Sequence, residues 1–170
     1  MNEPHPWSFG VKFGLVAGAI GVVLLVFVFG AILHLGPFQR EELTQGQLLA
    51  QGDEICRKAH AAFEQLQDKQ PQTPDQAEAL TSQLISIAED ERDRIAELNG
   101  PPDFDDEIQT YLDARDLGIE ALKRGREAAA AGRADIYAAA QKELDETQRQ
   151  RVQIARQVGF AECSRKIGKS

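Results

Sequence analysis

Histidine, cysteine and methionine are scarce in this chain of 170 residues, which has three His, two Cys and one Met. The methionine is Met1, and beyond residue 36 the only histidine is His60. A di-iron bundle needs Glu-x-x-His pairs on two helices, and haem attachment needs Cys-x-x-Cys-His, so both are excluded. Walker, Rossmann, HExxH and Ser-His-Asp patterns are also missing. We therefore expect no cofactor, no metal site and no enzymatic activity.

Positively charged residues are also few: the chain has 19 Lys and Arg against 27 Asp and Glu, which gives a net charge of −8. Glu3 and Lys12 cancel within residues 1–36, so the whole negative charge falls on the rest of the chain. Nucleic acids and lipid surfaces are themselves polyanions. The composition therefore predicts no nucleic-acid partner.

Residues 13–35, FGLVAGAIGVVLLVFVFGAILHL, form a long run without formal charge. About 20 apolar residues cross the ~30 Å hydrocarbon core, whereas a cleaved signal peptide has a shorter apolar core followed by small residues. The run predicts a transmembrane signal anchor. Lys12 on its amino-terminal side favours a cytoplasmic segment 1–12 and a single-pass cell-membrane protein whose remainder lies outside.

Glycines at Gly10, Gly14, Gly18 and Gly21 give this segment a small-xxx-small spacing. Such spacing lets two membrane helices approach closely, so these positions are candidates for a homodimer or for contact with a protein partner. The alternative is that glycine is simply frequent in membrane helices.

Beyond Gly36, apolar residues recur at helical spacing and no strand-like alternation persists, which predicts an all-α fold. We expect a linker over 36–48 and, over 49–163, an antiparallel up-down-up-down four-helix bundle with packing of coiled-coil type. Thr73 with Pro74 and Gln76 predicts a capped helix start, DFDDE (103–107) another, and Gly159 a helix end. The expected inner stripes of the second and fourth helices are Leu80, Leu84, Ile87, Ile95 and Leu98, and Ile136, Ala140, Leu144, Val152, Ala155 and Val158.

Acidic side chains concentrate in EDERDRIAE, which mixes Glu89, Asp90, Glu91 and Asp93 with arginines. We expect a solvated helix face with ion pairs, and the alternative is a docking strip for a basic partner. The acids of the chain are expected at the surface because of their helical phase.

The bundle topology predicts that Cys56, early in the first helix, lies near Cys163, after the last helix. In an oxidising compartment outside the cell this favours a disulfide. A zinc site with His60 and a thiol nucleophile activated by His60 remain as alternatives. A lone histidine at helical spacing is expected to be a half-exposed surface residue. A lipid-bearing cysteine is excluded by the distance of Cys56 from the apolar run.

Four features recur together in one known group: a cysteine that opens a helix (ICRKAHAAF), the break ELNGPP, Tyr111-Leu112 on a long helix, and the ending ARQVGFAEC. Over about residues 50–163 the chain resembles uncharacterised exported, membrane-anchored helical-bundle proteins of high-GC Gram-positive bacteria. The resemblance implies an extracytoplasmic bundle tied by its two terminal cysteines, and no catalytic residues.

The tail 164–170 carries Arg165, Lys166 and Lys169 without an acid, so it is a candidate for contact with a lipid surface. The alternative is a solvated terminus. Taken together, the sequence predicts a membrane-anchored, non-enzymatic binding, scaffold or accessory protein of the cell envelope. The alternative is a ligand-sensing bundle that signals through a membrane partner.

Overall fold

The computed structural model describes residues 42–165, which form four α-helices and one short 3-10 helix. The helices are α2 (Gln45–Gln67), α3 (Pro74–Ala96), α4 (Asp105–Ala130) and α5 (Ala134–Val158), with η1 (Pro102–Phe104) between α3 and α4. The predicted all-α bundle is confirmed for this part of the chain. None of these helices combines the length and the apolar character that a membrane crossing requires. The predicted anchor 13–35 with its glycines, the segment 1–12, Lys166 and Lys169 lie outside the described residues.

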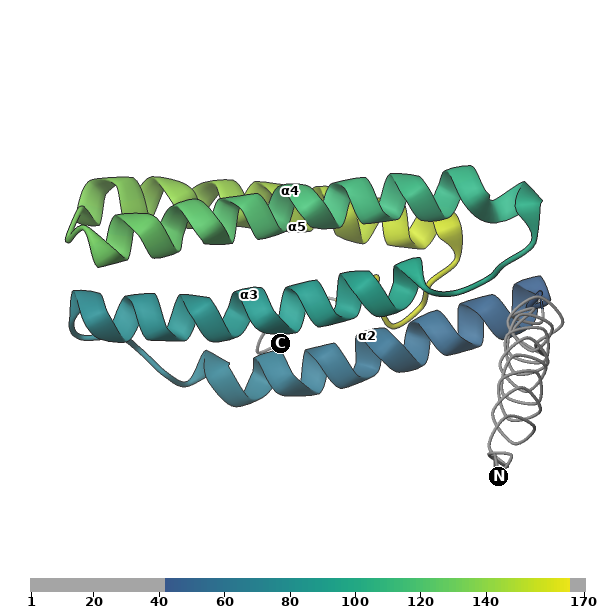
Figure 1. Cartoon of the computed structure of the whole chain (residues 1–170), viewed down its shortest axis with the longest axis horizontal. Helices are drawn as coiled ribbons and strands as arrows, with labels where there is room; N and C mark the ends of the chain where they lie inside the picture. Colours follow the sequence, from purple (N-terminus) through teal and green to yellow (C-terminus); the bar gives the residue numbers. More distant parts are fainter. Residues whose placement is uncertain (1–41, 166–170) are drawn as a thin grey trace, which may run out of the picture. The chain divides into compact units, whose positions relative to one another are not determined.

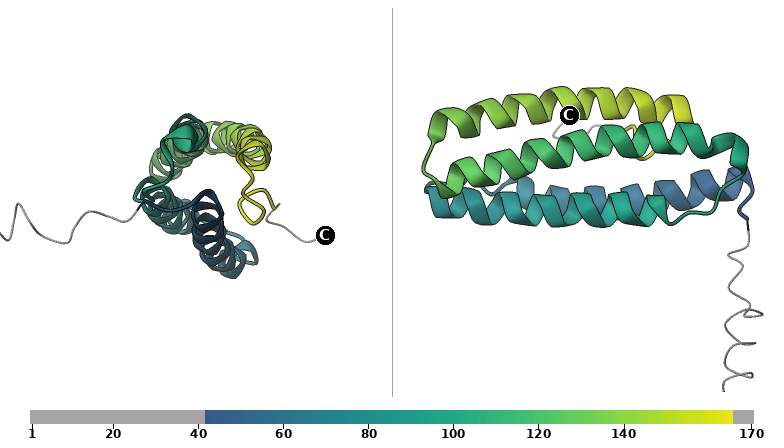
Figure 2. Two further views of the ribbon diagram at one scale, coloured as in Figure 1. Left: turned by 90° about the vertical axis from the view of Figure 1, so that its right-hand side faces the viewer. Right: turned by 45° about the horizontal axis from the view of Figure 1, so that its top comes forward.

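Consecutive helices pack side by side and alternate in direction, so that α2 packs on α3, α3 on α4 and α4 on α5 (Figure 1). We expected the last helix to lie directly beside the first. Instead, in the described part of the chain, α2 and α5 are not a closely packed pair. The segment after α5, drawn yellow, turns from α5 toward α2 (Figure 2). The fourth side of the bundle is therefore connected by this segment rather than by packing between two helices.

The helical bundle begins earlier than the predicted boundary at residue 49, because α2 already starts at Gln45. Thr44 and Gln47 form a capping box, in which Gln47 N donates to Thr44 Oγ1 at 3.3 Å and Thr44 N donates to Gln47 Oε1 at 2.9 Å. Leu48 is fully buried, and Leu43 N donates to the carbonyl oxygen of Asn99 at 2.7 Å. The predicted linker 36–48 therefore ends sooner, because its last residues already belong to the bundle.

The other predicted helix ends agree with the structure. Gln76 N donates to Thr73 Oγ1, and Pro74 occupies the first turn of α3. The Gln76 side chain, however, accepts from Gln72 N at 2.8 Å rather than from Thr73. Helix α4 opens with three acidic residues in its first turn, which suits the positive end of the helix dipole. Gly159 ends α5 with φ of 100°, a left-handed conformation that favours glycine.

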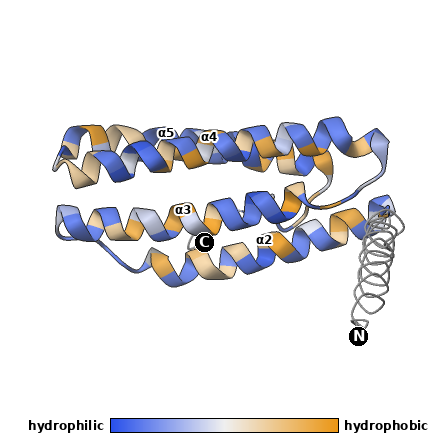
Figure 3. Cartoon of the chain, viewed as in Figure 1, coloured by the Kyte–Doolittle hydropathy of each residue, from blue (hydrophilic) through white to orange (hydrophobic). Residues whose placement is uncertain are grey.

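The apolar residues of each helix alternate with polar ones (Figure 3), and the buried ones form two core clusters. One surrounds Tyr111 and the two cysteines, and the other joins α3 to α4 through Ile85, Ala88, Ile119 and Leu122. The buried stripe of α3 is rotated from the predicted one and consists of Ala77, Thr81, Ile85, Ala88, Glu91 and Ile95. In α5, Ile136 is 39% exposed, contrary to the prediction.

Candidate functional site

The predicted disulfide joins Cys56 of α2 to Cys163, with the two Cα atoms 5.1 Å apart, although it is the segment after α5, and not α5 itself, that lies beside α2. Neither sulfur is then a free thiol, so the nucleophile and the zinc site drawn from these cysteines do not fit this structure. In residues 42–165 no group of three or more His, Cys, Asp or Glu side chains is placed to hold a metal ion. The two cysteines attach the segment after α5 to α2.

Residues 159–165, here called the closing segment, pack closely against α2. Phe160 is fully buried, and its ring meets the Tyr111 ring edge-on with centroids 5.5 Å apart. The Phe160 ring lies against Gly52, where a Cβ atom would come closer than 3.0 Å to it. Glu162 N donates to Asp53 Oδ1 at 2.8 Å. Gly52 in the middle of a helix is thus explained by close approach of an aromatic ring.

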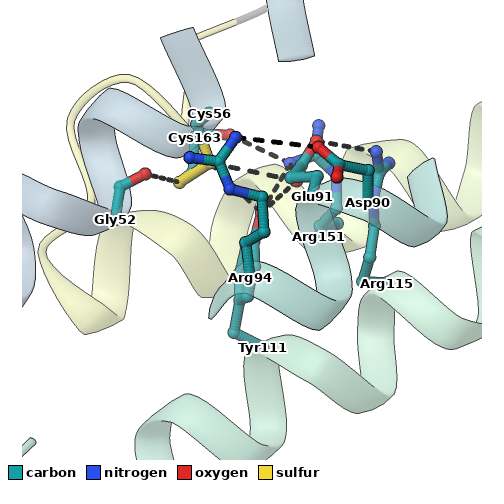
Figure 4. Close-up of polar contacts among 9 residues, drawn as sticks. All are labelled: Gly52, Cys56, Asp90, Glu91, Arg94, Tyr111, Arg115, Arg151 and Cys163. Atoms are coloured by element: carbon teal, nitrogen blue, oxygen red, sulfur yellow. Dashed lines mark hydrogen bonds and ion pairs between the residues drawn. A yellow bond between two sulfur atoms is a disulfide. The ribbon is translucent and has the colours of Figure 1, made fainter. Parts of the chain in front are cut away.

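A buried charged cluster lies beside the disulfide (Figure 4). Glu91 of α3 accepts hydrogen bonds from Tyr111 Oη at 2.8 Å and from Arg115 Nη2 at 2.7 Å. Arg151 of α5 donates from Nη1 to Tyr111 Oη at 3.1 Å and to the Cys163 carbonyl oxygen at 3.2 Å. Its Nη1 also lies 3.7 Å from Glu91 Oε1. The cluster connects three helices and the closing segment.

The cluster carries more positive than negative charge. The side chains of Glu91, Arg115 and Arg151 are 0%, 9% and 3% exposed. Burial lowers the pKa of Arg115, whereas Tyr111 and Glu91 outweigh burial and raise the pKa of Arg151. Both arginines stay charged at neutral pH, since a guanidinium does not lose its proton in proteins. One carboxylate therefore faces two cations.

Tyr111 acts in this cluster as a neutral hydroxyl. Burial, reinforced by the neighbouring Glu91 carboxylate, raises the pKa of Tyr111 far above its ordinary value. Its hydroxyl donates a hydrogen bond to Glu91 and accepts one from Arg151. Cys56 Sγ lies 3.6 Å from the same hydroxyl oxygen, but a disulfide sulfur has no proton to donate. Tyr111 thus orients the acid and one cation and adds no charge.

His60 is fully buried, which corrects the expectation of a half-exposed residue. Neither ring nitrogen has a hydrogen-bond partner. Burial lowers the pKa of His60, and the nearby cations Arg151, Arg165 and Arg115 act in the same direction against the attraction of Glu91. The imidazole is therefore neutral at neutral pH. Its burial follows from its place in α2, between Ala59 and Phe63 on the inward face.

A cavity of about 250 Å³ adjoins the charged cluster. Its walls come from all four helices, including α2 and α5, which do not pack closely on each other. The apolar part of the lining consists of Phe63, Leu66, Leu80, Leu84, Ala114, Gly118, Leu122 and Leu144. The polar part consists of Lys69, Arg115, Thr147, Gln148 and Arg151. Two leucines of the predicted α3 stripe, Leu80 and Leu84, thus line the cavity and are only partly buried.

Sequence reasoning missed Glu91, Arg115 and Arg151. In EDERDRIAE the expectation of a solvated face holds for Asp90 and Asp93, whose side chains are 69% and 68% exposed, and is wrong for Glu91. Their helical phase could have indicated their burial, because each of the three residues lies in the buried stripe of its helix.

The described start of the basic tail bears on the predicted lipid contact. Arg165 is exposed, but it lies 3.7 Å from Glu64 and 3.5 Å from Glu162. This cation is therefore paired with carboxylates of the bundle in exposed ion pairs, which contribute little, and the lipid contact stays a prediction.

No family model, curated protein or solved structure matches the chain. The resemblance to exported helical-bundle proteins therefore stays a prediction, and function has to be argued from the geometry.

Proposed function

We propose that the chain is a single-pass membrane-anchored, extracytoplasmic protein whose helical bundle binds a small molecule without acting as an enzyme. The observation that carries the proposal is the cavity of about 250 Å³ between the four helices. Small-molecule sites are concave, mostly apolar and equipped with a few polar groups that orient the ligand. The apolar walls and the two buried arginines have this character.

The size of the cavity suits a small ligand. A cavity of about 150 Å³ with apolar walls accepts benzene. The cavity here is larger, at about 250 Å³, so it has room for a benzene ring with a short substituent. Of the two functions predicted from the sequence, a ligand-binding bundle gains support from this space, whereas a scaffold does not require it.

Two features support a membrane anchor with the helical bundle on the extracytoplasmic side. The apolar run 13–35 is long enough to anchor the chain, and the Cys56–Cys163 bridge suits an oxidising compartment. Ligand binding would alter how the four helices pack on one another.

The altered packing would be transmitted through the membrane anchor to a partner protein whose membrane helix contacts the glycines of the anchor.

The test compares two Gly→Leu variants of the full chain in phosphatidylcholine nanodiscs. At Gly118, which lines the cavity, an added Cβ atom would meet only ordinary contacts, with Thr147 Oγ1 at 3.7 Å and Leu144 Cδ1 at 3.9 Å. Gly118→Leu should therefore fill the cavity. Gly46→Leu is the matched control, because Gly46 is exposed on α2 with nothing within 4 Å of the added atom.

The probes are benzyl alcohol, phenylacetamide and phenylacetate, with binding followed by isothermal titration calorimetry. We expect saturable binding of at least one probe to the wild type and to Gly46→Leu, and loss of binding in Gly118→Leu. Absence of saturable binding by all three probes, or equal binding by Gly118→Leu, would contradict the proposal.

A further inference from the structure

We infer that the ligand of the cavity is a monoanion with a compact apolar body, such as an aryl-substituted carboxylate, and that its anionic group binds between Arg115 and Arg151. This inference rests on the proposed function, since it names the ligand chemistry of the same cavity. Charge, unmade hydrogen bonds and apolar volume each support one part of it.

The charge of the lining has one sign. Lys69, Arg115 and Arg151 line the cavity, and no acidic residue of the described part of the chain does. This contrasts with the chain as a whole, which has a net charge of −8. An excess of cations around a cavity in an acidic protein attracts anions and disfavours cationic ligands.

The buried cluster lacks one negative charge. Among the described residues, Glu91 is the one carboxylate that interacts with Arg115 and Arg151, which leaves a net charge of +1 away from water. A buried charge without a counterion is costly, and bound anions or paired residues normally compensate it. A ligand with a single negative charge would balance the buried cluster of Glu91, Arg115 and Arg151.

Both arginines also retain unmade hydrogen bonds. The Nε atoms of Arg115 and Arg151 are buried and have no hydrogen-bond partner. Buried polar groups in folded proteins are almost always partnered, so these two N–H groups are unusual. A guanidinium is a planar set of donors that fits the two oxygens of a carboxylate. Because neither Nε atom is accessible to solvent, a carboxylate in the cavity would interact with the charge of the two guanidinium groups, and it would reach the Nε–H donors only after these side chains rotate.

The rest of the ligand has to be apolar and small. Away from the arginines the walls are formed by Phe63, Leu66, Leu80, Leu84, Leu122 and Leu144. The guanidinium carbon of Arg115 lies 5.5 Å from the centre of the Phe63 ring, so the charged and the apolar parts of the lining adjoin. A bare anion such as acetate would leave this surface uncovered, and phenylacetate would cover it.

The experiment uses the full chain in phosphatidylcholine nanodiscs, which carry no anionic lipid. Phenylacetate, its neutral isostere phenylacetamide, and acetate are titrated at neutral pH and constant ionic strength. We expect phenylacetate to bind with Kd of about 0.1–10 mM, the range for a ligand of this size. Phenylacetamide should bind about ten- to a hundredfold more weakly, because it forfeits hydrogen bonds to charged donors. Acetate should show no saturable binding.

Two variants localise the effect. Arg115→Gln removes one cation of the lining and should bring the phenylacetate and phenylacetamide affinities close together. Arg124→Gln removes one exposed cation of α4, which pairs with Glu143 outside the cavity lining, and should leave the preference for phenylacetate unchanged. If Arg115→Gln does not fold, the comparison of the three probes on the wild type still decides the question.

Each outcome is decisive. Binding of phenylacetamide as tight as that of phenylacetate would overturn the anionic ligand while leaving the small-molecule function intact. Binding of acetate as tight as that of phenylacetate would overturn the apolar body. Failure of benzyl alcohol, phenylacetamide and phenylacetate alike to bind would overturn the proposed function itself, and the inference with it.

Discussion

Replacing Glu91 by glutamine tests whether the buried cluster holds the bundle together. The Glu91 side chain is fully buried and contacts Tyr111, Arg115 and Arg151, which belong to two other helices. The substituted amide would keep the shape and one acceptor oxygen, but two buried guanidinium groups would lose their only counterion among the described residues. Removal of one partner of a buried ion pair costs about 3–5 kcal/mol.

Such a loss is a large share of the roughly 5–15 kcal/mol that stabilises a typical domain. The measurement is urea unfolding of the full chain, followed by far-UV circular dichroism, with the free energy of unfolding extrapolated to water. The matched control is Glu89→Gln on the same helix, because Glu89 pairs with Lys123 at 3.2 Å in an ion pair whose side chains are 46% and 36% exposed. Exposed pairs contribute about 0–1 kcal/mol. An equal, small effect of the two substitutions would refute the structural role assigned to Glu91.

Three further predictions concern stability and use the same unfolding measurement. Burial lowers the pKa of His60 below its ordinary value of 6.5, so as the pH falls below about 6.5 the unfolded chain binds a proton that the folded protein resists. The free energy of unfolding should then fall by up to about 1.4 kcal/mol per pH unit, and the pH dependence should be flatter in His60→Phe; an unchanged slope would contradict this. Replacing Cys56 and Cys163 by Ala opens a loop with a sequence separation of 107 and should cost at most about 4.7 kcal/mol, whereas an unchanged stability would show that the bridge does not form. Gly52→Ala should cost about 1–3 kcal/mol, because its Cβ atom would overlap the Phe160 ring, and the double variant with Phe160→Leu should recover part of that loss.

Much of the fold was predictable from the sequence because local signals and the global arrangement agree. Helical periodicity, the Thr73-Pro74 start, the acidic start of α4 and the glycine after α5 each indicated an element that the structure contains. The disulfide followed from the order of antiparallel helices and from two cysteines at opposite ends of the bundle sequence. These features depend on short stretches of chain and on simple topology.

The candidate site was harder to predict because it depends on which polar residues the helices turn inward. Charged side chains are exposed far more often than buried, so Glu91 and Arg151 were assigned to the surface by residue type although their positions along the helices place them in the buried stripes. His60 was assigned to the surface for the same reason. The cavity depends on how far apart α2 and α5 lie, a distance that neither helix specifies by itself.

Nuclear magnetic resonance of the two arginine side chains tests the anionic ligand most directly. In the ¹⁵N-labelled full chain, the Nε–H signals of Arg115 and Arg151 report on two buried groups that have no hydrogen-bond partner in the structure. We predict that phenylacetate shifts both signals along a saturating curve with the Kd found by calorimetry, and that phenylacetamide leaves them almost unchanged. If phenylacetate binds while both signals stay in place, the anion does not bind between these arginines and the central claim is wrong.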